Sequence, residues 1–441
     1  MLRRTITRAT ALAGALCAIA ALSGSSFAQD ETPHVASIVH AGRLLADPSN
    51  GRVLTEQSVL IGADGAILGI EPGYVTRDGA SVIDQRNRFV LPGLIDSHVH
   101  LTGELGPNQL IEEVTLTASD AALRGAENAR KTLLAGFTTV ADVGAPNDAI
   151  FALRRATAEN RVPGPRIIAS GAPITPDGGH GDANGFSPGV IDALRNPNAC
   201  SGADACRRAV RRQIQAGADV IKITATGGVL SNTAAGVEQQ FSDAEFEAIV
   251  EAAHSMGRRV TAHAHGAGGV NAALRAGVDS IEHGTYLDRE GIRLMRRGDR
   301  YLVPTMMAGW WVTQLAEQGG VLTPAQTEKA RAVGPALVGM VRRARAAGVR
   351  IAFGTDTGVS PHGMNAREFQ LMVEAGFTPL QAIQAATINA ADHLQLDGVT
   401  GRIAPGYAAD IIAVDGDPLA DVATLMNVRF VMARGVTHKN E

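Results

Sequence analysis

The sequence predicts an α/β protein, a (β/α)8 TIM barrel with a small β-sandwich domain built from both chain ends. Between about residue 90 and residue 395, short apolar runs alternate with segments whose apolar residues recur at helical spacing. This alternation is typical of a parallel sheet with a helix after each strand, and eight units over about 300 residues match a closed barrel. The 50 glycines fit the many tight turns that such a fold needs.

Eight apolar runs are the candidate barrel strands. In chain order they are FVLPGLID, FTTVADV, RIIASG, DVIKITAT, RRVTAHAH, DSIEHG, YLVPTM and RIAFGTD. Helical patterns lie between them, for example at residues 116–136, 242–257 and 268–277. Each of these three patterns ends in a glycine, which can close a helix in the left-handed conformation.

Both chain ends have the residue pattern of short β-strands. The N-terminal runs are SIVHAGRLLA, QSVLIGADGAILGIEPG and SVIDQRN, with Asp-Gly and Asn turn signals. The C-terminal runs are GRIAPGYAADIIAVDGDPL and VRFVMARGV. We therefore expect residues 29–89 and 396–441 to combine into one β-sandwich domain beside a barrel of residues 90–395.

Residues 1–28 have the features of a signal peptide. Arginines in MLRRTITRAT precede the apolar stretch ALAGALCAIAALSG, and Ser26-Phe27-Ala28 offers small residues for cleavage before Gln29. The apolar stretch is too short to span a membrane comfortably. We expect an exported protein, periplasmic or secreted, that has no membrane association in its mature form.

Cys200 and Cys206 lie six positions apart in the polar segment NPNACSGADACRRAV. In an exported protein this spacing favours a local disulfide, which would pin the loop that enters the next helix. A zinc site is the alternative, although no histidine or further cysteine lies near the pair in the sequence.

The composition gives no electrostatic reason to expect nucleic acid or an anionic membrane as a partner. Charged residues make up 19% of the chain, apolar residues 45%, and the formal net charge is −4. We expect a small-molecule substrate, and a homo-oligomer as the assembly.

Polar side chains stand at the ends of strands that otherwise consist of apolar residues. They are His98, His100, Lys222, His263, His265, His283 and Asp356. Residues i and i+2 of a strand share a face, so both members of each HxH pair point the same way. Because the carboxyl ends of barrel strands meet at one rim, where barrel enzymes have their active sites, these groups converge on one predicted metal site.

Each of these residues also has a structural interpretation on its own. A lone histidine at a strand end is usually a hydrogen-bonded rim residue, Lys222 could extend its amine outward, and Asp356 could cap a helix. However, a buried lysine without a partner is costly, and several independent coincidences at one rim are less plausible than one site.

This set of motifs resembles the amidohydrolase superfamily. LPGLIDSHVH, the lysine of VIKI, AHAHG, IEHG and GTD follow in the order of that superfamily's binuclear pattern, and ATINAADHLQLDGVTGRIAPGYAADIIAVDGDPL is similar to the family's C-terminal segment. The subgroup that it resembles most is the exported Xaa-Pro dipeptidase-like and ochratoxin-hydrolysing amidohydrolases, near the imidazolonepropionases. The loops ITPDGGHGDANG and GVSPHGMNAREF are similar to that subgroup as well.

The resemblance implies two divalent metal ions. Zinc is the preferred candidate, and manganese and cobalt are the alternatives. The ligands of one ion are His98, His100 and Asp356, and those of the other are His263 and His283. Lys222, carbamylated by CO2, would bridge the two ions. The carbamate forms from a neutral amine, which burial near cations favours by lowering the pKa of the lysine.

The expected mechanism uses a metal-activated hydroxide that attacks an amide carbonyl. Asp356 would take a proton from the water and deliver it to the leaving amine. The spacing leaves open which of His263 and His265 is the ligand; the resemblance assigns His263 and leaves His265 to orient the substrate or stabilise the oxyanion. His180 is a candidate substrate contact and equally a solvent-exposed loop histidine.

We therefore predict an exported metal-dependent amidohydrolase that cleaves the amide or peptide bond of a dipeptide or N-acyl amino acid, as an Xaa-Pro dipeptidase or an ochratoxin A amidase does. One alternative is a cyclic-amide hydrolase or deaminase of the imidazolonepropionase type. Those enzymes usually hold one metal and lack a lysine at the position of Lys222. The other alternative is a non-catalytic barrel protein that only binds a small molecule. The complete set of metal-binding side chains counts against this alternative.

Overall fold

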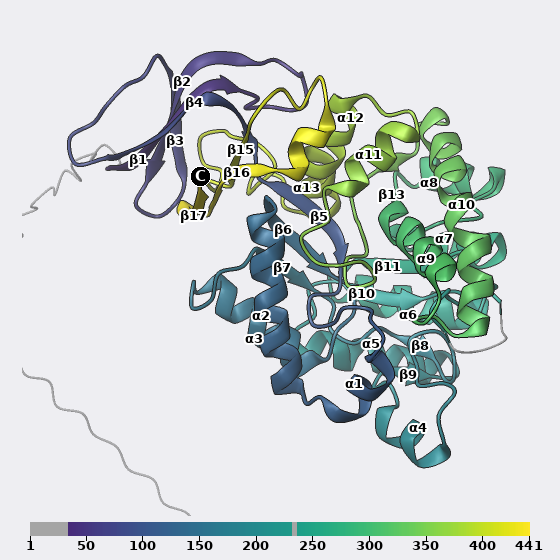
Figure 1. Ribbon diagram of the computed structural model, residues 1–441. Coiled ribbons are helices and arrows are strands. Elements are labelled where there is room, and N and C mark those ends of the chain that lie inside the picture. Colours follow the sequence, from purple (N-terminus) through teal and green to yellow (C-terminus); the bar gives the residue numbers. More distant parts are fainter. Residues whose placement is uncertain (1–33, 232–235) are drawn as a thin grey trace, which may run out of the picture. The chain divides into compact units, whose positions relative to one another are not determined.

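In the part of the chain that the structure describes, residues 34–231 and 236–441, each of the eight runs predicted for the barrel contributes a strand (Figure 1). In this computed structural model these strands are β5 (Leu94–Val99), β6 (Phe137–Asp142), β7 (Arg166–Ala169), β10 (Ile221–Thr224), β11 (Val260–Ala264), β12 (Ser280–His283), β13 (Tyr301–Val303) and β14 (Arg350–Ile351). They form two parallel sheets, β5-β6-β7 and β10-β11-β12-β13-β14. The first half of the run FVLPGLID, residues 89–92, belongs instead to β4 (Ser81–Pro92) of the sheet formed by the chain ends. The predicted signal peptide lies outside the described residues.

Backbone contacts join these two sheets at both edges. At one junction Ile174 forms an isolated bridge with Ile223. At the other, the amide of Asp356 donates to the carbonyl of His98 at 2.7 Å. The strand order is therefore circular, but the two ladders are not continuous, which differs from the single closed sheet that the sequence predicts. The chain leaves regular strand geometry at these junctions, and Asp356 itself has a φ of 59°.

Helices follow the strands and cover them, as predicted (Figure 1). Their bounds are α1 (Gln109–Thr115), α2 (Ala118–Leu134), α3 (Asn147–Ala158), α4 (Pro188–Leu194), α5 (Ala203–Ala216), α6 (Asp243–Ser255), α7 (Ala267–Ala276), α8 (Arg289–Arg297), α9 (Met306–Gln318), α10 (Pro324–Ala346), α11 (Arg367–Glu374), α12 (Pro379–Gln384) and α13 (Ala390–His393). A π-helix, Ala385–Asn389, precedes α13, and a 3-10 helix spans Val422–Met426.

Local sequence signals set several helix ends. Capping boxes formed by Thr117 with Asp120 and by Ser242 with Glu245 begin α2 and α6. Gly277 ends α7 in the left-handed conformation, at a φ of 104°. Within the described ranges, none of the helices has the length and apolar character needed to cross a membrane.

The two chain ends combine into one seven-stranded sheet, in the order β17-β16-β15-β4-β1-β2-β3. Its strands are β1 (Val35–Leu44), β2 (Leu54–Gly62), β3 (Ile67–Pro72), β4 (Ser81–Pro92), β15 (Ile411–Val414), β16 (Val428–Ala433) and β17 (Val436–Asn440). The junction between the two ends is antiparallel, with Leu91 of β4 opposite Ile412 of β15. The predicted combination of both ends is present, whereas its arrangement as a sandwich and the domain bounds remain predictions.

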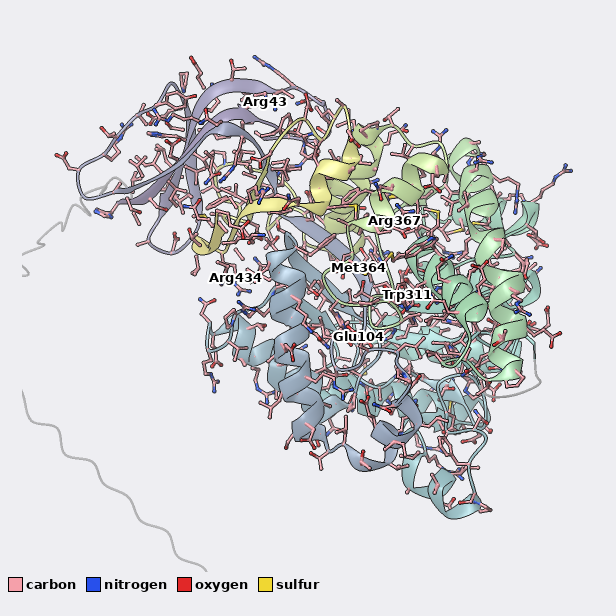
Figure 2. All side chains as sticks on the ribbon, in the orientation of Figure 1. Arg43, Glu104, Trp311, Met364, Arg367 and Arg434 are labelled. Atoms are coloured by element: carbon pink, nitrogen blue, oxygen red, sulfur yellow. A yellow bond between two sulfur atoms is a disulfide. The ribbon has the colours of Figure 1, made fainter. Side chains whose placement is uncertain are left out.

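Arg434, just after β16, connects this sheet to a helix of the barrel (Figure 2). Its guanidinium donates to the carbonyl of Thr157 in α3 at 2.9 Å and to the side chain of Asn160 at 3.2 Å. The C-terminal strands are thus fixed to the barrel by hydrogen bonds as well as by their pairing with β4.

Cys200 and Cys206 form a disulfide, with their Cα atoms 5.1 Å apart. Cys200 ends the short strand β9 (Ala199–Cys200), which pairs with β8 (Thr175–Pro176), and Cys206 lies in the first turn of α5. Both sulfur-bearing residues are buried. The bridge therefore anchors one end of the loop between β8 and β9, which carries His180.

Replacing both cysteines (Cys200→Ser with Cys206→Ser) should lower the free energy of unfolding by about 2 kcal/mol, because the bridge closes a short loop in the unfolded chain. Urea unfolding of the variant and of the oxidised parent measures this difference. The parent unfolded in the presence of a reductant is the control and should match the variant. Two free thiols in the oxidised, denatured parent would contradict the disulfide.

Candidate active site

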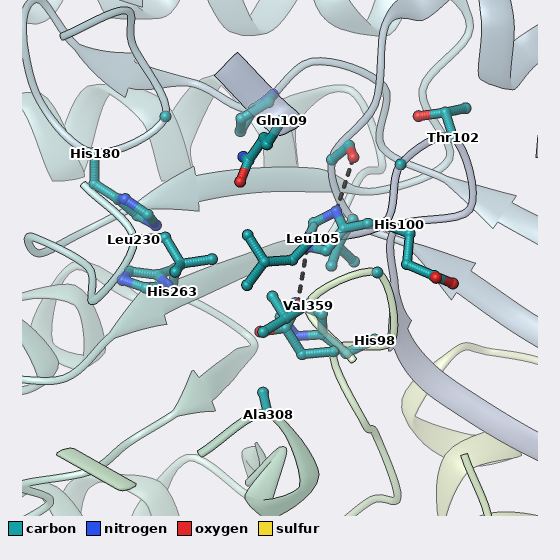
Figure 3. Close-up of a pocket in the computed structure, with 18 of the residues that line it drawn as sticks. His98, His100, Thr102, Leu105, Gln109, His180, Leu230, His263, Ala308 and Val359 are labelled. Atoms are coloured by element: carbon teal, nitrogen blue, oxygen red, sulfur yellow. Dashed lines mark hydrogen bonds and ion pairs between the residues drawn. The ribbon is translucent and has the colours of Figure 1, made fainter. Parts of the chain in front are cut away.

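One cavity of about 640 Å³ brings the predicted site residues together (Figure 3). Its lining includes every one of them: His98, His100, His180, Lys222, His263, His265, His283 and Asp356. Much of the remaining wall is apolar, and Leu105, Leu230 and Val359 lie between the histidines in Figure 3. The cavity combines convergent polar groups with apolar walls, as small-molecule sites usually do.

The first cluster consists of His98, His100 and Asp356, whose ligand atoms lie within 4.8 Å of one another. Oδ1 of Asp356 is 3.4 Å from Nε2 of His98 and 3.2 Å from Nε2 of His100. The Nδ1 atoms of the two rings are engaged elsewhere, with Glu282 at 2.7 Å and with the carbonyl of Gly144 at 2.8 Å. Both rings therefore present Nε2 to the aspartate.

The second cluster consists of His263, His265 and His283, again within 4.8 Å of one another. Nδ1 of His265 bonds the hydroxyl of Thr285, and Nδ1 of His283 that of Thr305, both at 2.7 Å. The ring of His263 is oriented differently, because its Nε2 lies 3.3 Å from the carbonyl of Gly227. The geometry brings all three rings together, so it does not by itself choose between His263 and His265 as a ligand.

Lys222 extends from β10 into the same cavity and is 5% exposed. Burial lowers the pKa of its amine, although the carboxylates of Glu282, Asp356 and Asp142 act in the opposite direction. The lysine thus lies in the interior near both clusters, rather than extending to solvent.

The donor set fits divalent cations. Oδ1 of Asp356 is buried and has no hydrogen-bond partner among the described residues, since its close contacts with His98 and His100 lack hydrogen-bond geometry. A carboxylate oxygen left in this state beside two imidazole nitrogens is a typical metal ligand. Burial lowers the pKa of His265 to about 3 and that of His283 well below its usual value. These rings are therefore neutral at pH 7, which metal binding requires.

His180 lies in the loop between β8 and β9, at the edge of the second cluster. Its ring centroid is 4.2 Å from that of His263, and its Nδ1 is 2.7 Å from the hydroxyl of Ser231. Burial lowers its pKa to about 4. The structure thus places His180 against the cavity, and not as a loop histidine that faces solvent.

A family model for the amidohydrolase family matches residues 89–437. The chain belongs to the amidohydrolase family. Among curated relatives, ochratoxinase from Aspergillus niger is 32% identical over 424 residues, which cover 91% of this chain and 85% of that protein. The family assignment agrees with the motifs that the sequence carries.

Solved structures of this amidohydrolase's relatives share its fold closely. A Xaa-Pro dipeptidase with bound methionine in the active site has a TM-score of 0.86 and 37% identity, covering 92% of this chain and all (100%) of that one. The Aspergillus niger ochratoxinase has a TM-score of 0.82 and 30% identity, covering 92% and 97%. Both similarities extend over nearly the whole described chain.

The sequence does not predict the groups that hold the imidazole rings of this amidohydrolase. They are Glu282, Thr285, Thr305, Ser231 and the carbonyl of Gly144. Glu282 had a recognisable signal, since it is a charged residue inside the apolar run DSIEHG. The hydroxyl and carbonyl partners had none, because serine, threonine and glycine are common in strand-to-helix loops.

Removing divalent cations with a chelator should abolish amide hydrolysis and lower the melting temperature, because ions that bind only the folded state stabilise it by mass action. Dialysis followed by addition of zinc, manganese or cobalt should restore both properties. Differential scanning fluorimetry and a hydrolysis assay on the same samples measure this. An unchanged melting temperature and full activity after complete metal removal would contradict a metal centre.

Proposed function

We propose that this amidohydrolase cleaves the amide bond of a dipeptide or an N-acyl amino acid, using two divalent cations, with zinc as the preferred candidate metal. One observation carries the proposal: two clusters of metal-binding side chains share one apolar cavity with a buried lysine. The similarity to a Xaa-Pro dipeptidase and to ochratoxinase supports the same substrate class. When bound, the cations would acidify a water and polarise the substrate carbonyl.

We propose that Lys222 carries a carbamate. Its neutral amine, which burial favours, would attack CO2, form a C–N bond and release one proton. The product is an anionic group with two oxygen atoms at a place where lysine alone would offer a cation. With this charge, Lys222 would join the two groups of ligands that would hold the cations, His98, His100 and Asp356 for one and His263 and His283 for the other.

Asp356 is proposed to move the proton. It lies beside both imidazoles of the first cluster, and although burial acts to raise its pKa, His98 and His100 outweigh this effect and hold the pKa well below the usual value. A carboxylate can accept a proton from the attacking water. As the C–N bond breaks, the same group would deliver this proton to the nitrogen of the leaving amine.

His265 and His180 are proposed to orient the substrate. The hydroxyls of Thr285 and Ser231 can donate to their Nδ1 atoms, which leaves Nε2–H as the donor of each neutral ring. Donors of this kind can hold the substrate and stabilise the oxygen that becomes negative during attack. In this assignment His263 is the ligand of the second cation.

The cavity supports an apolar leaving group, such as proline or phenylalanine, and the carboxylate next to it is proposed from the similarity to a Xaa-Pro dipeptidase and to ochratoxinase. The volume of the cavity, about 640 Å³, lies within the range of small-molecule sites, and Leu105, Leu230 and Val359 line it. Ochratoxin A is an N-acyl phenylalanine and belongs to the same chemical class. The buried Lys222 counts against the cyclic-amide hydrolase or deaminase and against the non-catalytic binding protein.

Three further predictions belong to this proposal. The strands would close as a (β/α)8 barrel, with residues 29–89 and 396–441 as a composite β-sandwich domain. The protein would be exported after cleavage near Ala28. It would assemble as a homo-oligomer.

A substrate panel tests the function directly. Xaa-Pro and Xaa-Phe dipeptides, N-acyl amino acids and ochratoxin A should include a substrate that the metal-loaded protein hydrolyses with kcat/KM of about 10⁴ M⁻¹s⁻¹ or more. Cyclic amides and aminopurines serve as controls and should remain intact. Turnover of the controls alone would favour the alternative activities, and no turnover would favour the binding protein.

Lys222→Ala should abolish hydrolysis and lower the bound metal, because the bridging oxygens are lost. Short carboxylic acids such as acetate should restore part of the activity by occupying the vacated space. Lys222→Met is the matched control, since its side chain fills that space and should prevent rescue. Full activity of either variant would exclude the proposed role of the lysine.

Asp356→Asn retains the size and one oxygen of the side chain but cannot carry the proton. Turnover should fall by roughly a hundredfold or more, while KM should change less. Metal content must be measured in the same samples and saturated, because the ligand is also weakened. A fully loaded variant with near-normal turnover would assign proton transfer to another group, with His265 the next to test.

A further inference from the structure

We infer that Glu282 is a positioning residue for the metal centre, fixing the ring of His98 so that its Nε2 faces the cation. The inference rests on the metal centre of the proposed function. Glu282 lies on β12, immediately before His283, and the residue is 0% exposed. A charged group at this depth is costly unless specific partners hold it.

The contact with His98 sets the direction of the ring. Oε2 of Glu282 is 2.7 Å from Nδ1 of His98, and both side chains are buried. Nδ1–H donates to the carboxylate, which leaves the lone pair on Nε2, the atom that faces Asp356 at 3.4 Å. A metal-binding histidine needs this tautomer and this orientation.

The second oxygen of Glu282 is held by two hydroxyls. Thr261 donates to Oε1, and Ser280 lies 3.3 Å from the same atom and donates to Thr261 at 2.8 Å. Thr261 and Ser280 are paired across β11 and β12. The carboxylate therefore accepts hydrogen bonds from both sides, from Thr261 (itself a partner of Ser280) at Oε1 and from His98 at Oε2, which leaves it little rotational freedom.

Beneath Glu282, away from the substrate cavity, lies a second cavity of about 40 Å³. Three polar atoms along it are buried and have no hydrogen-bond partner among the described residues: Oγ of Ser97, Nε of Arg259 and Nδ1 of His393. A water needs about 10–15 Å³ and several polar partners, so this space suits ordered water. The glutamate is thus held between the metal ligands and a polar interior, instead of being packed in apolar surroundings.

Glu282 differs from the other groups that hold the imidazoles. His100 bonds a backbone carbonyl through Nδ1, and His265 and His283 bond threonine hydroxyls. Among these described Nδ1 partners, Glu282 alone is a carboxylate. A charged acceptor makes the imidazole a stronger ligand, and loss of such a partner typically weakens metal binding by 10- to 100-fold.

Glu282→Gln tests the inference, because it retains the shape and removes the charge. Apo protein is titrated with zinc in competition with a chromophoric chelator, with no substrate present. We expect the affinity of one site to fall by about 10- to 100-fold. Turnover at saturating zinc should recover substantially with an unchanged KM. Thr261→Val should weaken zinc binding by a smaller factor, because it frees the carboxylate without removing it.

Asp410→Asn is the matched control. Asp410 is also a buried carboxylate, 2% exposed, and accepts from Thr400 and from the amide of Arg434, each at 2.8 Å. This variant should bind zinc as the parent does. Parent-like affinity in Glu282→Gln would overturn the inference, and so would an equal loss in Asp410→Asn.

The zinc-binding test of Glu282 can be distinguished from the hydrolysis test of the proposed function. If the parent binds zinc but hydrolyses no amide, the function fails, and the effect of Glu282→Gln on affinity still decides the inference. If Glu282→Gln binds zinc as the parent does while the parent hydrolyses dipeptides, the inference fails alone. If the parent binds no zinc, both fail.

Discussion

The hydrogen bond from the amide of Asp356 to the carbonyl of His98, at 2.7 Å, is the contact on which the site depends. It joins the first strand of the circular order to the segment after the last, and so brings the aspartate beside the His98–His100 pair. Asp356 has a φ of 59°, and His283 and Thr305 also have positive φ, at 66° and 49°. Backbone conformations of this kind are unfavourable for residues other than glycine and concentrate at functional sites.

Burial gives these residues their chemical character. Six imidazoles, the carboxylate of Asp356 and the amine of Lys222 share one largely apolar cavity, where charges are poorly solvated. Burial lowers the pKa values of His263, His265 and His283, so these three rings are neutral at pH 7, and it lowers the pKa of the Lys222 amine as well. Both effects favour cation binding, because a ligand must have a free lone pair.

Much of the fold could be predicted because its signals are local. Each barrel strand is an apolar run between turn residues, and capping boxes such as Thr117 with Asp120 mark the helices. The metal-binding candidates could be predicted because polar residues at strand ends contradict the apolar pattern around them.

Other features depend on tertiary geometry that a sequence does not contain. The partners of the rings, such as Thr305 and the carbonyl of Gly144, are set by side-chain rotamers and loop paths. The predicted closed sheet is interrupted at two junctions, the bridge between Ile174 and Ile223 and the turn that places Asp356. Whether His263 or His265 is a ligand depends on ring orientation, which the i, i+2 spacing leaves open.

The central claim is that two cations bind side by side across Lys222. An anomalous difference map from crystals grown with zinc, recorded at the zinc absorption edge, tests it most directly. The account predicts two peaks about 3.5–4 Å apart, one beside His98, His100 and Asp356 and the other beside His263 and His283. A single peak, or two peaks too far apart for one carbamate to bridge, would contradict it.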